Sequence, residues 1–155
     1  MTKKPTLHVM VGLPGSGKTT KAKELEMEHN ALRLTCDEWH IRLFGYNPTD
    51  ENHGRNHENI EEIMLEIAEK VLSHGVSVII DFGSWSRAER DDLRRMASKA
   101  DANFKIHFMD VPIEKLYERL KKRNQLVTTE GFVISKEKMD RYLKLFEPPT
   151  EEEFI

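Results

Sequence analysis

Short apolar runs alternate along this chain with longer segments in which apolar and polar residues mix. Four runs predict strands, because each is apolar, only a few residues long and bounded by polar or turn-forming residues. They cover 7–11, 31–36, 76–80 and 104–111. Runs that are apolar at successive positions are typical of parallel strands that are covered by helices on both faces.

The segments between these runs predict helices. In the clearest one, apolar residues from Ile60 to Leu72 recur at helical spacing, and Gly75 ends the pattern. A final helix over 135–146 has Ser135 as its candidate N-cap. The other predicted helices cover 18–29, 38–44, 87–100 and 112–124, and the predicted loops cover 45–56 and 125–134. The residues from Glu147 onward are interpreted as an acidic tail.

Alternation of strands and helices predicts the fold class. It favours an α/β three-layer sandwich, α/β/α, with a mainly parallel sheet and right-handed crossovers. The 155 residues fit a single domain over 1–155, without internal repeats or a linker.

Composition limits the classes of partner and the compartment that we expect for this protein. The net charge of −3 argues against a binder of long nucleic acids, which usually carries a basic excess. Cys36 is the only cysteine, so no intrachain disulfide can form. The charged N-terminus does not resemble a signal peptide, and no apolar stretch approaches the ~20 residues of a membrane helix. We therefore expect a cytoplasmic protein.

Residues 12–19 match the phosphate-binding pattern G-x-x-x-x-G-K-[ST], and we call them the P-loop. Glycines let such a loop curl so that its backbone N–H groups and the following helix face phosphate oxygens. Lys18 is expected to reach the β- and γ-phosphates of ATP, and the Thr19 hydroxyl to ligate Mg²⁺. A glycine-rich turn without a ligand is the alternative. The expected nucleotide-binding residues of this segment are Gly12, Leu13, Pro14, Gly15, Ser16, Gly17, Lys18, Thr19 and Thr20.

Guanine specificity is not expected, because the chain lacks the Asn-Lys-x-Asp motif with which GTPases read their base. Adenine is therefore favoured.

Two acids follow predicted strands, at the sheet edge where ligands bind in open α/β sheets. Asp37 is the candidate catalytic base, because transfer of a phosphoryl group to a hydroxyl needs a carboxylate near the attacking oxygen. An N-cap of the helix over 38–44 is the alternative, and the two roles are compatible. Asp81 is expected to hold Mg²⁺ or to position an acceptor, unless it only forms a turn before Gly83.

Two arginines precede a predicted lid over 124–135. Arg119 and Arg123 are four residues apart and therefore share one helix face. Arginines beside a lid can cover a triphosphate and neutralise charge in the transition state, so both are candidate nucleotide-binding residues and Arg123 is also a candidate catalytic residue. The alternative is a basic helix with solvated charges.

Further polar and aromatic residues lie near the two acids. Arg90 is a second-rank candidate that could instead pair with a surface acid. His53 and His57, with Glu51 and Glu58 nearby, are interpreted as surface residues rather than a metal site. The candidates for binding an acceptor are Trp39, Arg42, Trp85 and Arg87, with core packing or surface ion pairs as the alternatives.

Taken together, the P-loop, the two acids and the paired arginines resemble P-loop kinases of the polynucleotide 5′-kinase type. Zeta-toxin and chloramphenicol-phosphotransferase proteins are relatives of that family. The ending from Phe146 to Glu151 resembles bacterial AAA-family ATP-binding proteins regarded as kinases. The resemblance covers nearly the whole chain.

That resemblance implies a P-loop NTPase fold of the nucleoside-kinase-like type, with the sheet order 2-3-1-4-5. It also implies that Asp37 is the base, that Asp81 organises the site and that Arg123 is the lid arginine. The polynucleotide kinases carry an arginine three residues beyond the base, where this chain has His40. This departure argues against a polynucleotide acceptor, unless Arg42 stands in for that arginine.

Two functions are consistent with these residues. The first is an ATP-dependent phosphotransferase that acts on a hydroxyl of an unidentified small-molecule or nucleotide-like acceptor, a class that includes toxins and resistance enzymes. The second is an ATP-binding switch that hydrolyses ATP with water as its only acceptor.

Overall fold

The computed structural model describes residues 3–46, 50–125 and 132–154. Four parallel strands form one sheet in the order β2-β3-β1-β4. The strands are β1 (Thr6–Val11), β2 (Leu32–Thr35), β3 (Val78–Asp81) and β4 (Asn103–Phe108). The predicted α/β fold with a parallel sheet is confirmed. The fifth strand implied by the family resemblance is not found within the described ranges.

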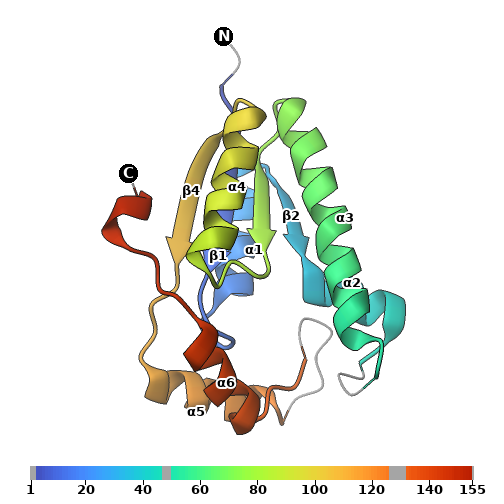
Figure 1. Ribbon diagram of the computed structural model, residues 1–155, viewed down its shortest axis with the longest axis vertical. Helices are drawn as coiled ribbons and strands as arrows, with labels where there is room; N and C mark the ends of the chain where they lie inside the picture. The colour runs from blue at the N-terminus through green and yellow to red at the C-terminus, as the bar shows by residue number, and fades with distance from the viewer. Residues whose placement is uncertain (1–2, 47–49, 126–131, 155) are drawn as a thin grey trace.

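Helices cover both faces of this sheet (Figure 1). Helices α3 (His53–Ser73) and α4 (Arg87–Lys99) cover one face, and α1 (Lys18–His29) covers the other. Successive side chains of β1 point to opposite faces of the sheet. Val9 and Val11 pack with residues of α3 and α4, and Met10 packs on the other face with Ala22 and Leu25 of α1. A fully buried central strand explains why its sequence is apolar at successive positions.

A third apolar cluster lies beyond the carboxyl ends of the strands. There α5 (Ile113–Arg123) and α6 (Lys136–Leu145) pack against the P-loop, and Figure 1 shows both helices beneath the sheet. Leu13 of the loop is buried with Leu116 and Leu120 of α5 and with Met139 of α6. This cluster fixes α5 directly against the residues expected to bind phosphate.

The second and third helices begin earlier than the sequence predicts. Helix α2 (Cys36–Phe44) follows β2 without a loop, so Asp37 lies in its first turn and is not its N-cap. Helix α3 begins at His53, inside the predicted loop over 45–56. Its first turn contains Gly and Asn, which are weak helix formers. Packing overrides that propensity, because the His53 ring contacts His40 and Phe132.

The C-terminal segment, interpreted from the sequence as an acidic tail, is folded against α4. It forms the 3₁₀ helix η1 (Glu151–Phe154), and the Glu153 side chain is only 2% exposed. Arg90 of α4 donates to both carboxylate oxygens of Glu153, at 2.6 and 3.3 Å. A buried ion pair therefore holds this segment against α4.

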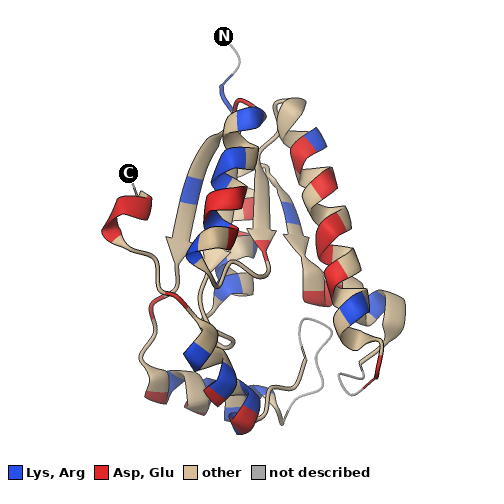
Figure 2. Cartoon of the chain, in the orientation of Figure 1, with Lys and Arg blue, Asp and Glu red and all other residues tan. Residues whose placement is uncertain are grey.

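Charged residues of both signs are mixed over α4 and α5, whereas α3 carries mainly acidic ones (Figure 2). None of the helices in the described parts of the chain has the length and apolar character needed to span a membrane.

Candidate active site

A cavity of about 680 Å³ lies beyond the carboxyl ends of the strands. Ligands of open α/β sheets bind at this edge. We call its two parts the P-loop end, formed by residues 14–20 with Asp81, and the Asp37 end, formed around Asp37 by side chains from α2, α3, the β3–α4 loop and α6. The lining residues of the Asp37 end include Asp37, His53, His57, Glu58, Glu61, Trp85 and Tyr142.

Backbone geometry shapes the P-loop end. Gly15 and Gly17 adopt φ values of +84° and +92°, in the left-handed region that side chains disfavour. A Cβ at Gly12 would lie 2.5 Å from Ser16 Oγ and 3.1 Å from Met109 Cβ, so a larger residue there would force these neighbours to shift. The Ser16 hydroxyl is buried and has no hydrogen-bond partner among the described residues. Buried polar atoms need a partner, and a phosphate oxygen would supply one.

Three side chains join the P-loop to β2 and β3. The Thr19 hydroxyl donates to Asp81 Oδ2 at 2.8 Å, and the Thr35 hydroxyl donates to the same oxygen at 2.9 Å. Hydroxyl and carboxylate oxygens are the donor set that Mg²⁺ prefers, so Thr19 and Asp81 fit the metal of a nucleotide complex. Thr35 was missed by the sequence analysis, because a threonine that ends a strand gives no distinguishing signal.

Lys18 lies between the two acids of the site. Its Nζ donates to the Gly12 carbonyl at 2.8 Å. Burial lowers the pKa of Lys18, and the charges of Asp81 and Asp37 oppose that shift. Burial also raises the pKa of Asp37, against the opposing influence of His57 and Lys18. The pKa of Asp81 is raised by burial too, although Lys18 and the two threonine hydroxyls oppose it. The charge of Lys18 thus limits the rise in pKa of both Asp37 and Asp81.

Arg119 and Arg123 both line the cavity. Arg119 Nη1 donates to the Gly15 carbonyl at 3.3 Å, and Arg123 Nη2 donates to the Phe132 carbonyl at 2.8 Å. The Arg123 charge also acts on Lys18 and Asp37. The predicted lid over 124–135 lies partly outside the described residues. Of it, Asn124 exchanges hydrogen bonds with the backbone of Ile134.

The Asp37 end contains side chains that the sequence analysis did not connect. His57 Nε2 lies 3.9 Å from Asp37 Oδ1 and 3.4 Å from Glu61 Oε1. Trp85 packs against Tyr142, with ring centroids 4.6 Å apart. The Trp85 backbone is itself held, because its carbonyl accepts from the Glu147 N–H at 2.8 Å. No pattern in the sequence pairs residues so far apart.

Three of the four candidate acceptor-binding residues do not line this cavity in the described structure, and Trp85 is the exception. Trp39 and Arg42 lie on exposed parts of α2. Arg87 donates to Asp91 and Thr150 instead. Arg90 pairs with the buried Glu153, not with a surface acid. Arg87 and Arg90 share a reason, since both lie beside the acid-rich C-terminal segment and find partners there.

His53 and His57 are not plain surface residues, as the sequence analysis interpreted them. Both are half-buried and both line the cavity. The reason is the early start of α3, which turns them toward His40 on α2.

Known proteins with this fold include kinases. A protein of Autographa californica nuclear polyhedrosis virus, whose name describes a bifunctional polynucleotide kinase/RNA ligase, is 25% identical over 150 residues. That match covers 90% of this chain but only 20% of the viral protein. The chain therefore spans a small part of this relative.

Solved structures agree on the fold. The Pnkp1/Rnl/Hen1 RNA repair complex contains a chain that matches with a TM-score of 0.76 and 25% identity, over 94% of this chain and 45% of that one. A sugar kinase from Janibacter sp. matches with a TM-score of 0.66 and 24% identity, over 98% of this chain and 83% of that one. The parallel sheet with its P-loop is thus the fold of P-loop kinases.

The family described as "AAA domain" matches residues 7–149, which is most of the chain and includes the P-loop and both acids. This protein, whose P-loop lies against α5 and whose two acids lie at the carboxyl edge of the sheet, belongs to that AAA domain family.

Proposed function

We propose that this protein transfers the γ-phosphate of ATP to a hydroxyl group of a small molecule. The observation that carries the proposal is that Asp37 and the P-loop line one cavity, where Asp37 and Lys18 influence each other's pKa. A phosphotransferase needs a phosphate-binding loop and, across the cavity from it, a carboxylate that can receive the acceptor's proton.

The roles follow from the chemistry of each group. Asp37 accepts the proton of the attacking hydroxyl, and its raised pKa makes it a better base than an ordinary carboxylate. Lys18 and the P-loop N–H groups bind the phosphates, and Arg119 and Arg123 neutralise the charge that develops on the transferred group. Thr19 and Asp81 would hold Mg²⁺, which would offset the negative charge of the phosphates.

The charge at the Asp37 end supports an acceptor without a phosphate group. Three carboxylates line that end, from Asp37, Glu58 and Glu61, and they outnumber the ammonium group of Lys138 on α6, which also lines the cavity. They repel an anionic acceptor, whereas they accept hydrogen bonds from hydroxyl groups. His40 supports the same inference, because it is buried, does not line the cavity within the described structure, and offers no arginine-like cation to an acceptor phosphate. We therefore propose a sugar, polyol or nucleoside rather than an RNA or DNA end.

The test measures ADP release from ATP with a panel of sugars, polyols, nucleosides and an oligonucleotide with a free 5′-hydroxyl. An acceptor-dependent rate is expected with a compound of the first three classes. In Asp37→Asn that rate is expected to fall by about 10²–10⁴-fold while the affinity for ATP persists. Asp92→Asn on the exposed surface of α4 is the matched control and keeps the wild-type rate.

Each outcome is decisive. ADP release that no compound accelerates supports an ATP-hydrolysing switch instead, and a rate that responds only to the oligonucleotide replaces the small acceptor by a nucleic acid. An Asp37→Asn variant with undiminished transfer contradicts the assignment of the base.

A further inference from the structure

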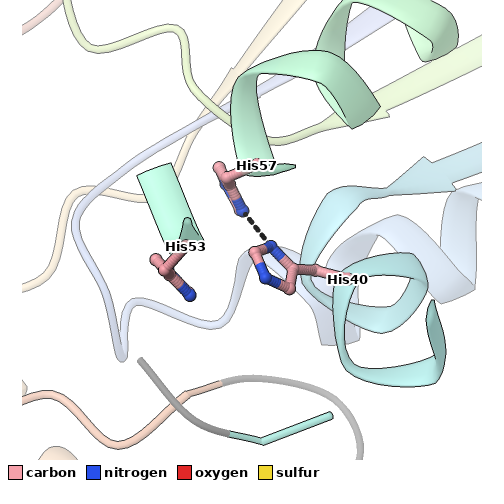
Figure 3. Close-up of side chains that lie close together, drawn as sticks. All are labelled: His40, His53 and His57. Carbon is pink, nitrogen blue, oxygen red and sulfur yellow. Dashed lines mark hydrogen bonds between the residues drawn. The ribbon is translucent and has the colours of Figure 1, made fainter. Parts of the chain in front are cut away.

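Three histidines converge where α2 meets α3. His40 comes from α2, and His53 and His57 are four residues apart on α3, so both lie on one helix face. Figure 3 shows their rings turned toward one another, with His40 opposite the other two. The Mg²⁺ candidates Thr19 and Asp81 belong to other elements, so this cluster is a separate group of side chains.

The distances suit a single metal ion. One ring nitrogen of each histidine lies within 4.8 Å of the others, and His40 Nδ1 is 3.1 Å from His57 Nδ1. In a tetrahedral zinc site with Zn–N bonds of about 2.0–2.1 Å, two ligand nitrogens are about 3.3 Å apart. The hydrogen-bonded His40–His57 pair is therefore near the separation that such an ion imposes, and the His53 nitrogen lies within 4.8 Å of both.

One nitrogen of the cluster lacks a partner. His53 Nδ1 is buried and accepts or donates no hydrogen bond within the described part of the chain. An unpaired buried nitrogen costs about 1–3 kcal/mol. A histidine placed in this way, beside two other imidazoles, is an available metal ligand.

Two of the three imidazoles, those of His40 and His53, favour the neutral form that binds metal. Burial, reinforced by the neighbouring histidines, lowers the pKa of His40 to about 4. Burial and His57 also lower the pKa of His53. Imidazole binds metal only in its neutral form, so these two ligands need not lose a proton at neutral pH.

His57 has the outer partner that metal-binding histidines usually have. Its Nδ1 faces His40, and its Nε2 lies 3.4 Å from Glu61 Oε1 on the next turn of α3. A carboxylate on the far nitrogen fixes the tautomer and the ring orientation of a ligating histidine. Burial alone would lower the pKa of His57, but Glu61 and Asp37 outweigh it and raise the pKa, as expected for an imidazole whose N–H faces acids.

We propose that His40, His53 and His57 bind one divalent transition-metal ion, with Zn²⁺ as the best fit. Three imidazole nitrogens favour zinc and its neighbours over Mg²⁺ or Ca²⁺, which prefer oxygen. His53 and His57 also line the cavity, so a water or a ligand in the cavity has access to the fourth coordination position. Zinc sites with three protein ligands commonly keep that position open.

A second set of ligands competes for the same histidine. Cys36, His57 and Glu61 also lie within reach of one ion, and Cys36 Sγ is 3.6 Å from His57 Nδ1. Burial raises the pKa of the Cys36 thiol, which opposes the thiolate form that metals bind. The histidine set is therefore favoured, and a cysteine ligand becomes an outcome of the test.

The experiment titrates the chelator-treated whole chain with Co²⁺, followed by competition with Zn²⁺. One equivalent is expected to give the visible absorption of tetrahedral cobalt, and Zn²⁺ is expected to remove it. His53→Ala is the main variant, because His53 is only half-buried and its loss is tolerated better than that of the buried His40. It is expected to weaken binding by about 100-fold or more, and Glu61→Gln by about 10-fold.

His74→Ala is the matched control. His74 follows α3 directly and is exposed, so its removal is expected to leave the affinity unchanged. Thermal unfolding without metal, measured for each variant, separates loss of a ligand from loss of the fold.

Three results would overturn the proposal. The first is the octahedral cobalt spectrum of a site made by water and oxygen. The second is an affinity that His53→Ala leaves unchanged. The third is a sulfur-to-cobalt charge-transfer band that disappears in Cys36→Ser, which assigns the ion to the cysteine set.

Discussion

The two ends of the cavity are built in different ways. The P-loop end comes from consecutive residues and from Asp81, and glycine backbone and short hydrogen bonds define its shape. The Asp37 end gathers side chains from the beginning of α2, from α3, from Trp85 and from Tyr142 of α6. A substitution at the P-loop end would disturb phosphate binding. At the Asp37 end, single side chains can be exchanged without changing the P-loop. Ligand specificity is therefore expected to reside at the Asp37 end.

Lys18→Ala is expected to have the largest effect, because it removes the cation of the P-loop end and leaves Asp37 and Asp81 without it. We expect kcat/KM for ATP to fall by about 10³-fold, with weaker ATP binding as part of the loss. Isothermal titration and steady-state kinetics measure the two quantities. Lys21→Ala, one turn later on α1 and paired with Glu24, is the control and should keep both. Unchanged ATP affinity in Lys18→Ala would remove the P-loop end from nucleotide binding.

The second prediction addresses what holds the Asp37 end in place. Arg90 donates to the Ser84 carbonyl at 2.9 Å as well as to Glu153, so it joins the loop that carries Trp85 to the C-terminal segment. Arg90→Met leaves the buried Glu153 with only the half-exposed Arg87, 3.9 Å away, and we expect a loss of about 3 kcal/mol in the free energy of unfolding. Urea denaturation measures it.

The control for that loss is the double variant Arg90→Met with Glu153→Leu. It removes both charges, so it should recover much of the stability. A double variant as unstable as Arg90→Met would show that the carbonyl contact with Ser84, and not the ion pair, supplies the stability.

The third prediction separates the two ends directly and depends on the proposed function. Trp85→Ala removes the ring that packs on Tyr142 beside the cavity, so the KM for the acceptor should rise by about 10-fold while ATP affinity stays unchanged. Trp39→Ala is the matched control, because Trp39 does not line the cavity within the described structure. If Trp85→Ala weakens ATP binding as much as acceptor binding, the two ends are not independent.

The last prediction concerns a histidine pair outside both ends. His8 Nδ1 and His107 Nε2 are 2.9 Å apart on β1 and β4, and burial lowers the pKa of each to about 4. The folded chain keeps these imidazoles neutral where the unfolded chain, with a pKa near 6.5, takes up protons. Stability contributed by the pair is therefore present above about pH 6.5 and is lost as the pH falls toward 4.

The expected loss is roughly 1 kcal/mol per pH unit for each histidine in that window. Thermal unfolding between pH 4 and 8 measures it, and His107→Gln should flatten the curve relative to the wild type. If the variant kept the full pH dependence, the loss would come from groups other than this pair. Above pH 6.5 this loss of stability does not occur, so variants of the two cavity ends are best compared there.

Sequence predicted what is local. The P-loop, the acids after β2 and β3, and the strand pattern each depend on neighbouring residues, and the structure brings Lys18, Asp37 and Asp81 to one cavity. The sequence alone could not predict contacts between segments that are far apart along the chain. Thr35 on Asp81, Tyr142 on Trp85 and the Arg90–Glu153 pair join residues that are 46, 57 and 63 positions apart. The start of α3 was missed for a related reason, since a ring contact with Phe132 outweighs the weak helix propensity of its first turn.

The absence of a side chain at Gly15 has an effect beyond the loop. A Cβ there would lie 3.3 Å from Leu120 Cγ, and the Gly15 carbonyl accepts from Arg119, so the apex of the loop rests on α5. Added bulk at position 15 would strain a left-handed backbone and at the same time push away the helix that carries both arginines. Gly15 thus sets the distance between the P-loop, which is expected to bind a triphosphate, and α5, whose two arginines place positive charge beside it.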